Sequence, residues 1–158
     1  VVLFAVAAIV VMQVQTFMDR PGGDGATTSG SVTRIAQDAD GHYYADVRIN
    51  GVERRMLIDS GATTTALSAA TAAAAGIDVE ESTFPRLIDT ANGSVMARTA
   101  HVDRLTLGSI ETRGLPVVIA ETLGDQDMLG MNFLSRLKSW RVEGRTLILT
   151  PHHPQDAA

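Results

Sequence analysis

Residues 56–64, with the sequence MLIDSGATT, indicate the fold of this chain more strongly than any other stretch. The first three residues are apolar and favour a buried strand, which would hold the carboxylate of Asp59 rigidly at its end. Ser60 can hydrogen-bond to neighbouring backbone, and Gly61 permits a positive φ or the close approach of another segment. Because Asp, Ser and Gly also form ordinary turns, the stretch alone fits either a catalytic loop or a plain strand and turn.

Two further motifs follow along the chain. Residues 89–95 (DTANGSV) contain Asn-Gly, the dipeptide that most strongly favours a two-residue hairpin turn. Residues 128–134 (MLGMNFL) place a glycine between apolar residues, directly before a short helical pattern. The three motifs therefore combine a carboxylate loop, a hairpin and an apolar element that contains a glycine.

In this order the motifs resemble the active-site loop, the flap and the loop-packing element of retropepsin-like aspartic proteases, the retroviral-type family, and in particular its bacterial, membrane-anchored, single-domain members. The resemblance covers residues 31–150 and implies an all-β, closed β-barrel with a flap hairpin and one or two short helices. It implies Asp59 as the catalytic residue. The other site residues that it implies are Ser60, Gly61, Ala62 and Thr63 in the active-site loop, Thr90, Ala91, Asn92, Gly93 and Ser94 in the flap, and Met128, Leu129 and Gly130 in the loop-packing element.

The presence of a single Asp-Ser-Gly motif predicts the assembly. Peptide hydrolysis by this chemistry needs two carboxylates that share a proton, one activating water and the other donating a hydrogen bond to the scissile carbonyl. A homodimer with Asp59 of both chains on its twofold axis would supply the pair. Asp89 is the intrachain alternative, but Asp89-Thr90-Ala91 has alanine where the motif has glycine, and it lies in the expected flap. By resemblance, Ser60 should bond across the axis and Gly61 should lie against the substrate backbone.

The predicted function is therefore that of an aspartic endopeptidase acting on polypeptide substrates as a homodimer. A domain that keeps the fold but only binds a peptide or a partner is one alternative, and a membrane-tethered dimerisation domain is another. The intact Asp59, Ser60 and Gly61 favour the enzyme.

Composition narrows the class of partner. Hydrophobic residues make up 45% of the chain but aromatic residues only 4%, so the core must be aliphatic. A net charge of -5 without a basic cluster argues against binding to nucleic acid. The chain has no cysteine, which excludes disulfides and thiolate catalysis. Core positions are expected for Met56, Met96, Met128 and Met131.

Neither a metal site nor a cofactor is predicted. The histidines lack the spacing of metal ligands relative to acidic residues; they are His42, His101, His152 and His153. Asp125 and Asp127 are expected to lie in a solvated acidic turn, since hard cations need several convergent oxygens.

The N-terminal part differs from the rest in composition. Residues 1–12 are all apolar, and residues 1–18 are expected to form a transmembrane anchor truncated at its N-terminus, because a span needs about 20 apolar residues. A signal peptide is the alternative. Residues 19–30 are expected to be a flexible linker, residues 31–150 the protease domain and residues 151–158 a disordered tail. By resemblance, the protein would cross the bacterial inner membrane once, with its domain in the periplasm.

Local signals predict the individual elements of the domain. Asp40-Gly41 and Asn50-Gly51 predict tight turns. Ser68 and Gly76 predict the start and end of a helix over residues 69–75, and Asn132 is expected to cap a second helix over residues 132–137. The expected strands span residues 31–37, 42–49, 52–58, 84–88, 94–107, 115–120, 138–142 and 146–150.

Overall fold

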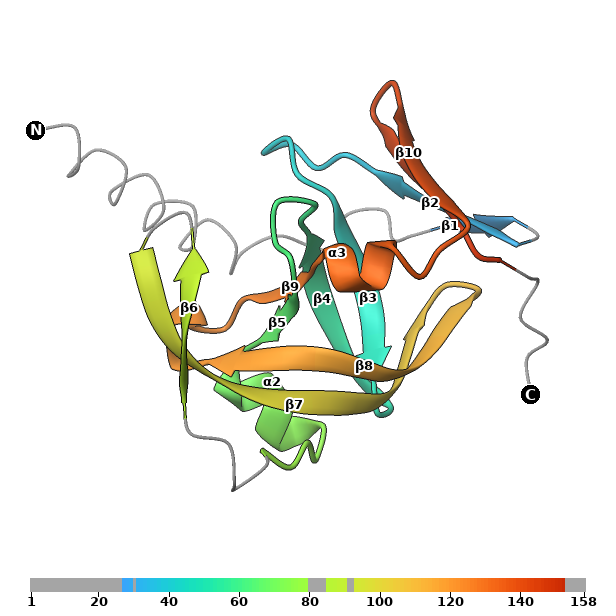
Figure 1. Ribbon diagram of the computed structural model, residues 1–158. Coiled ribbons are helices and arrows are strands. Elements are labelled where there is room, and N and C mark those ends of the chain that lie inside the picture. Colours follow the sequence, from blue (N-terminus) through green and yellow to red (C-terminus); the bar gives the residue numbers. More distant parts are fainter. Residues whose placement is uncertain (1–26, 30, 80–84, 91–92, 153–158) are drawn as a thin grey trace, which may run out of the picture.

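The computed structural model describes residues 27–29, 31–79, 85–90 and 93–152 (Figure 1). The expected anchor or signal peptide of residues 1–18, most of the expected linker and all but two residues of the expected tail lie outside these ranges. Within them, no helix has the length and apolar character needed to span a membrane.

Strands dominate the described part of the chain, as predicted. They are β1 Thr27–Ser29, β2 Val32–Ala36, β3 Tyr44–Ile49, β4 Val52–Ile58, β5 Thr65–Leu67, β6 Arg86–Thr90, β7 Gly93–Leu107, β8 Ile110–Ala120, β9 Asp127–Leu129, β10 Ser139–Glu143 and β11 Thr146–Thr150. The helices are α2 Ala69–Ala74, η1 Glu121–Leu123 and α3 Met131–Leu134. β4 has the predicted bounds, whereas β8 begins five residues earlier than expected, and β1 lies in the range expected to be linker.

A closed barrel forms the centre of the molecule. Its strands follow the order β3-β4-β9-β5-β8-β7, and the pairing of Ile49 with Leu105 joins β3 back to β7 and closes the ring. β4 and β9 are parallel, and so are β5 and β8, while the remaining pairs in the ring are antiparallel. Among the strands of the described residues, β6 pairs only with β7, and it extends the ring as a hairpin. The predicted all-β barrel with short helices is confirmed.

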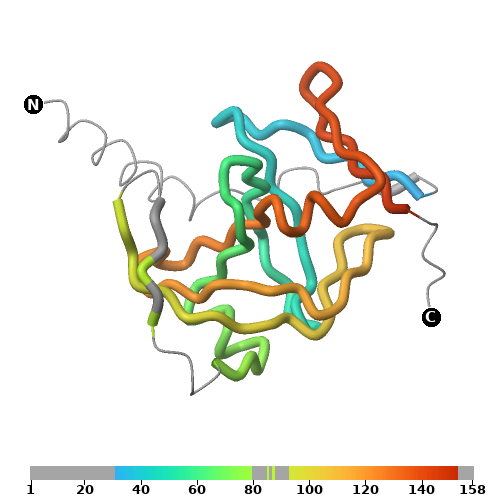
Figure 2. The backbone as a smooth tube through the Cα atoms, in the orientation of Figure 1, coloured from blue at the N-terminus to red at the C-terminus, as the bar shows by residue number. Residues whose placement is uncertain are grey.

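A second sheet, in the order β1-β2-β11-β10, lies beside the barrel. In Figure 1 the β6–β7 hairpin and the β10–β11 hairpin are at opposite ends of the molecule. The chain segment between β4 and β5, which contains Asp59, lies between these two ends (Figure 2). The fold therefore places a surface loop between two projecting hairpins.

The core is aliphatic, as the composition predicts. β3 alternates between buried and exposed residues, so that Val47 and Ile49 lie fully inside the barrel. Phe133 is the one aromatic residue among the largest fully buried side chains of the described residues. Met56 is also fully buried, but the core position expected for Met96 is wrong, because its side chain is 54% exposed on the hairpin. Met128 and Met131 are half-buried.

The two predicted helices are present, with one correction. α2 begins after Ser68, whose hydroxyl accepts a hydrogen bond from the Thr71 N–H at 3.2 Å. Gly76 follows the helix with a φ of +60°. α3 begins one residue earlier and ends three residues earlier than expected, and Gly130 rather than Asn132 precedes it. The side chain of Asn132 does not cap the helix, because its Oδ1 atom accepts a hydrogen bond from the N–H of Thr65 in β5.

Candidate active site

Asp59 is the first residue after β4 and is held there by a neighbouring strand. Its N–H donates to the carbonyl of Leu129 at 2.9 Å, which continues the parallel pairing of β4 with β9. The Oδ1 atom of Asp59 accepts the N–H of Gly61 at 2.8 Å. Asp59 is half-buried, whereas Ser60 and Gly61 are exposed. The loop therefore presents one carboxylate at the surface in a fixed orientation.

Gly130 lies directly against this loop. A Cβ atom at position 130 would be 2.7 Å from the carbonyl carbon of Thr64 and 2.8 Å from the carbonyl oxygens of Ala62 and Thr64. The next residue, Met131, donates its N–H to the Ala62 carbonyl at 2.7 Å. Only glycine fits at this approach of two backbones. The predicted loop-packing element, Met128, Leu129 and Gly130, thus contacts the predicted active-site loop.

Thr65 and Asn132 join the same two segments through their side chains, and sequence reasoning did not assign this contact. The Oδ1 atom of Asn132 accepts both the N–H and the hydroxyl of Thr65, each at 2.8 Å. The Thr65 hydroxyl oxygen also accepts the N–H of Gly130 at 3.2 Å. The amide nitrogen of Asn132 donates to the Pro116 carbonyl at 2.7 Å. This network fixes β5, β8 and α3 around the loop.

Removing the Thr65 hydroxyl should weaken the network measurably. Thr65 is fully buried, so Thr65→Val would leave the Gly130 N–H without its acceptor, at a cost of about 1–3 kcal/mol. Thr65→Ser keeps the hydroxyl and is the matched control. Chemical unfolding followed by circular dichroism should give a lower free energy of unfolding for the Val variant than for the Ser variant. Equal values would show that the hydroxyl does not support the loop.

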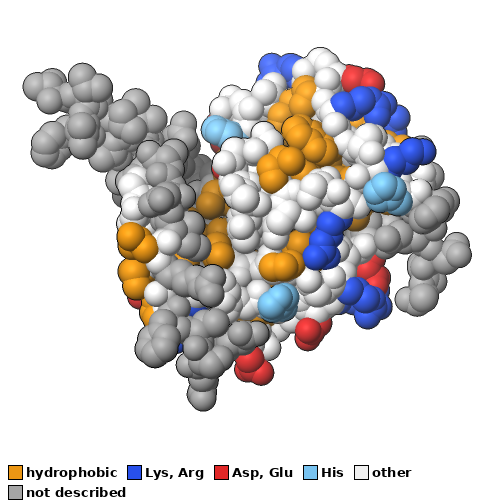
Figure 3. Space-filling view, in the orientation of Figure 1, with side chains coloured by type: hydrophobic (Ala, Val, Ile, Leu, Met, Phe, Trp, Pro, Cys, Tyr) orange, Lys and Arg blue, Asp and Glu red, His pale blue; other side chains and the backbone are white. Residues whose placement is uncertain are grey.

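The predicted flap corresponds to the end of the β6–β7 hairpin. Thr90 pairs with Gly93, whose φ is +113°, and Ala91 and Asn92 lie outside the described residues. Further from the tip, Leu87 pairs with Met96, and their side chains are 66% and 54% exposed. Directly opposed residues of a strand pair share one face of the hairpin. Figure 3 shows hydrophobic side chains at this end of the molecule.

Asp127 contradicts the expectation of a solvated acidic turn. Its side chain is only 2% exposed, and it accepts the Ser68 N–H at 2.8 Å and the Thr71 hydroxyl at 2.6 Å. Thr71 in turn accepts a hydrogen bond from the Nε atom of Arg54 at 3.0 Å. The carboxylate therefore ties α2 to the start of β9, two residues before Leu129. Asp125 is exposed, as expected.

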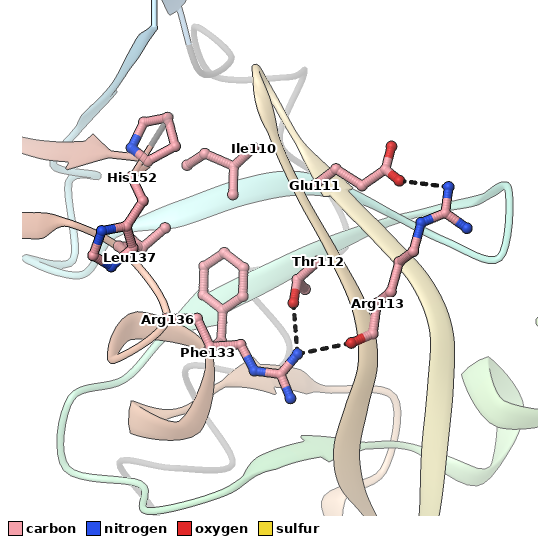
Figure 4. Close-up of a pocket in the computed structure, with 9 residues that line it drawn as sticks. Ile110, Glu111, Thr112, Arg113, Phe133, Arg136, Leu137 and His152 are labelled. Atoms are coloured by element: carbon pink, nitrogen blue, oxygen red, sulfur yellow. Dashed lines mark hydrogen bonds and ion pairs between the residues drawn. The ribbon is translucent and has the colours of Figure 1, made fainter. Parts of the chain in front are cut away.

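Asp59 is not among the residues that line the pocket drawn in Figure 4. This pocket has a volume of about 270 Å³, and Arg136 spans it, donating to the Thr112 hydroxyl at 2.7 Å and the Arg113 carbonyl at 2.8 Å. The hydrogen bond from Arg104 and the charge of Arg113 hold the pKa of the adjacent Glu111 below its ordinary value. No group of three or more acidic or histidine side chains in the described ranges is placed to hold a metal ion.

A closed β-barrel with one Asp-Ser-Gly loop, packed against a glycine of a neighbouring element and flanked by a long hairpin, defines a retropepsin-like domain. Comparison with known proteins agrees. The model of the gag-polyprotein putative aspartyl protease family matches residues 45–136. The chain therefore belongs to this family.

A solved structure and two curated proteins are also similar to the chain. The crystal structure of a retropepsin-like aspartic protease from Rickettsia conorii has a TM-score of 0.68 and 28% identity, covering 82% of this chain and 97% of that one. An uncharacterised protein of Rickettsia prowazekii (strain Madrid E) is 30% identical over 115 residues, 73% of this chain and 49% of that protein. An uncharacterised protein of Sinorhizobium sp. is 33% identical over 100 residues, 63% of this chain and 43% of that protein. The chain thus spans about half the length of these two curated relatives.

Proposed function

We propose that the protein is an aspartic endopeptidase that hydrolyses polypeptides as a homodimer, with water activated between the Asp59 carboxylates of two chains. The observation that carries the proposal is the Asp59 loop itself. Its carboxylate is accessible and oriented by the Gly61 N–H, and its backbone is fixed by Leu129 and Gly130. The family and the fold support the same reaction.

The chemistry requires the second chain. Two carboxylates about 3 Å apart cannot both be ionised, and aspartic proteases are the standard example of such a pair sharing one proton. The ionised member takes a proton from water as the water attacks the carbonyl carbon, and the protonated member donates a hydrogen bond to the carbonyl oxygen. In this assignment Ser60 bonds across the twofold axis, Gly61 lies against the substrate backbone and the β6–β7 hairpin closes over the substrate.

Specific activity should depend on protein concentration because each chain supplies one Asp59. It is expected to rise as the concentration approaches the dimer dissociation constant and to level off above it. Peptidase assays over a dilution series, paired with sedimentation equilibrium, would measure both curves on one sample. A constant specific activity across a range in which sedimentation shows dissociation would rule out the shared site.

Mixing active chains with Asp59→Asn chains gives an independent test of whether two chains share one active site. At equal amounts and random pairing, about a quarter of the dimers keep two aspartates, so activity should fall below the share of wild-type chain. Subunit exchange is verified first with two differently tagged chains. If activity is instead proportional to the amount of wild-type chain, the active site is not shared between chains. The second carboxylate would then come from the same chain, with Asp89 as the candidate.

A domain that only binds peptides remains the competing function, and a transition-state mimic separates the two. A peptide with a central hydroxyl in place of the scissile carbonyl should bind at least about 10²-fold tighter than an ordinary peptide of equal length, because only a working carboxylate pair favours it. Calorimetric titration of both peptides measures the ratio. Equal affinities, together with no cleavage of a peptide library, would favour the binding module.

The proposal extends to location: the N-terminal apolar residues anchor the protein in the bacterial inner membrane, with the protease domain in the periplasm. The apolar run of residues 1–12 supports this. Protease added to intact spheroplasts is expected to digest the domain, while a cytoplasmic marker protein stays intact. If the domain is digested only after the spheroplasts are lysed, it lies on the cytoplasmic side of the membrane.

A further inference from the structure

The pocket between β8, α3 and the segment after β11 brings apolar and cationic side chains together (Figure 4). Three of the side chains that line it are buried and apolar: Ile110, Phe133 and Leu137. Arg136 and His152 also line it, and both of these residues are exposed. The space, called the Arg136 pocket below, can therefore bury an apolar group directly beside a positive charge.

Arg136 is held in a fixed orientation by neutral acceptors. Its Nη1 atom donates to the Thr112 hydroxyl at 2.7 Å and the Arg113 carbonyl at 2.8 Å, and its Nη2 atom donates to the Gly114 carbonyl at 3.2 Å. These bonds use three of the five N–H donors of a guanidinium, which leaves the Nε–H and one N–H of Nη2. An arginine binds the two oxygens of a carboxylate through such neighbouring donors.

Glu111, the carboxylate among the lining residues, does not neutralise Arg136. Its Oε2 atom accepts from Nε and Nη2 of Arg104 at 3.0 Å and 2.8 Å, and its Oε1 atom lies 2.8 Å from Nη2 of Arg113. Two other guanidinium groups thus share this one carboxylate. No ion pair of Arg136 is found within the described ranges. Although the chain has a net charge of -5, the Arg136 pocket is therefore locally positive.

The chemistry of the pocket requires a ligand with two different parts. A purely apolar ligand would cover the remaining donors of Arg136 without offering them an acceptor. Inorganic phosphate would place charged oxygens against Phe133 and Leu137, where they find no hydrogen bond. A carboxylate next to an apolar group satisfies both sides. The volume of about 270 Å³ lies just below the range of about 300–1,000 Å³ for drug-sized ligands, so the occupant is small.

We propose that the Arg136 pocket binds the carboxyl-terminal residue of a peptide, with the terminal carboxylate on Arg136 and an apolar side chain against Ile110, Phe133 and Leu137. A ring N–H of His152 donates to the same carboxylate. The ligand is a peptide rather than a free amino acid, because the ammonium group of a free amino acid would lie beside the cationic rim of the pocket. The proposed endopeptidase would release peptides with new carboxyl termini, but binding itself requires no cleavage.

Peptides that differ in one group test this assignment. N-acetyl-alanyl-leucine with a free carboxylate should bind about tenfold more tightly than its carboxyl-terminal amide, which lacks the charge that Arg136 recognises. It should also bind about tenfold more tightly than N-acetyl-alanyl-serine, which lacks the apolar side chain. Free leucine, with its ammonium group, should bind more weakly than the acetylated peptide. This last comparison distinguishes a peptide site from an amino-acid site.

The location of binding is measured in the same titrations. In two-dimensional NMR spectra the backbone amide signals of Thr112, Arg113 and Leu137 should shift as the free-carboxylate peptide is added. Those of Ser60 and Gly61, in the proposed catalytic loop, should not. Shifts at Ser60 and Gly61 alone would show that the peptide binds in the catalytic groove and would overturn the proposal.

Arg136→Lys keeps the charge but removes the planar set of donors. This variant should bind the free-carboxylate peptide about tenfold more weakly, with no change in its affinity for the amide. The matched control is Arg48→Lys, at an exposed arginine that pairs with Glu53 outside the pocket, and it should bind both peptides as wild type does. Circular dichroism shows which variants are folded. If Arg136→Lys does not fold, the comparison of carboxylate with amide on the wild-type chain decides alone.

The proposal is overturned if the carboxylate and the amide bind equally, if neither binds, or if folded Arg136→Lys binds the carboxylate as wild type does. Its outcome is separable from that of the proposed function, because Asp59→Asn chains should bind the peptide as tightly as wild type. Equal affinities together with cleavage that requires Asp59 would remove the peptide site and keep the enzyme. Selective binding of the carboxylate by a chain without peptidase activity would do the reverse.

Discussion

Asp59→Asn chains are expected to fold and dimerise as wild type does, but to lose peptidase activity by about 10²–10⁴-fold, the contribution of acid–base catalysis. The amide is nearly the same shape as the carboxyl group, and its oxygen can still accept the Gly61 N–H that the Oδ1 atom of Asp59 accepts at 2.8 Å. The amide can neither take a proton from water nor share one with a second carboxylate. Measuring kcat/KM on a peptide library separates this loss from any change in stability.

The control for this prediction is Asp125→Asn. Asp125 is an exposed carboxylate between η1 and β9, so its replacement removes the same charge without touching the loop.

Wild-type activity should peak at acidic to mildly acidic pH, because the carboxylate pair must hold one proton. Full activity in the Asp59→Asn chain, with contaminating proteases excluded, would be incompatible with an aspartic mechanism, as would a wild-type rate that climbs steadily into alkaline pH.

Gly130→Ala is expected to cause the second-largest loss of peptidase activity, after Asp59→Asn. The backbone at Gly130, with φ −96° and ψ −174°, suits any residue, so the whole effect comes from the added methyl group. That group would meet backbone atoms of Ala62 and Thr64 at 2.7–2.8 Å, and backbone cannot rotate away as a side chain can. We expect a loss of stability of about 1–3 kcal/mol. The shifted loop should lower kcat/KM by about 10²-fold.

Gly114→Ala provides a control of similar thermodynamic cost. Gly114 has a φ of +58°, and a Cβ atom added there would have nothing within 4 Å, so alanine costs only the left-handed backbone, about 1–2 kcal/mol. Thermal unfolding should show comparable destabilisation in the two variants, while activity should fall sharply only in Gly130→Ala. If both variants keep wild-type kcat/KM, the close approach at Gly130 does not position the catalytic loop.

The features that could be predicted from the sequence are those encoded within a few residues. β4 has its predicted bounds because an apolar run ends at a turn-forming triplet, and Ser68 and Gly76 delimit α2 by local hydrogen bonding and backbone freedom. The glycine of residues 128–134 was correctly expected to pack beside the loop, through family resemblance. Its physical reason, a Cβ excluded by two carbonyl groups, is visible only in three dimensions.

The features that were missed depend on contacts between distant segments. Asn132 has the residue type of a helix cap, but Thr65, 67 residues away, offers its side chain two hydrogen bonds. Asp127 sits in a polar stretch typical of a surface turn, yet the N-terminal end of α2 closes over it. Met96 is apolar but belongs to a hairpin that extends beyond the barrel. None of these partners can be inferred from neighbours in sequence.

The long separation between the Asp59 loop and its supports has a consequence for biosynthesis. Asp59 leaves the ribosome well before Leu129, Gly130 and Asn132, the residues that hold its loop through backbone and side-chain contacts. Until that later segment has been made, β4 has no β9 beside it, and the barrel cannot close around the loop. A nascent chain therefore carries its carboxylate without the frame that orients it. The loop of the proposed catalytic residue is therefore framed only after residues 129–132 have been synthesised.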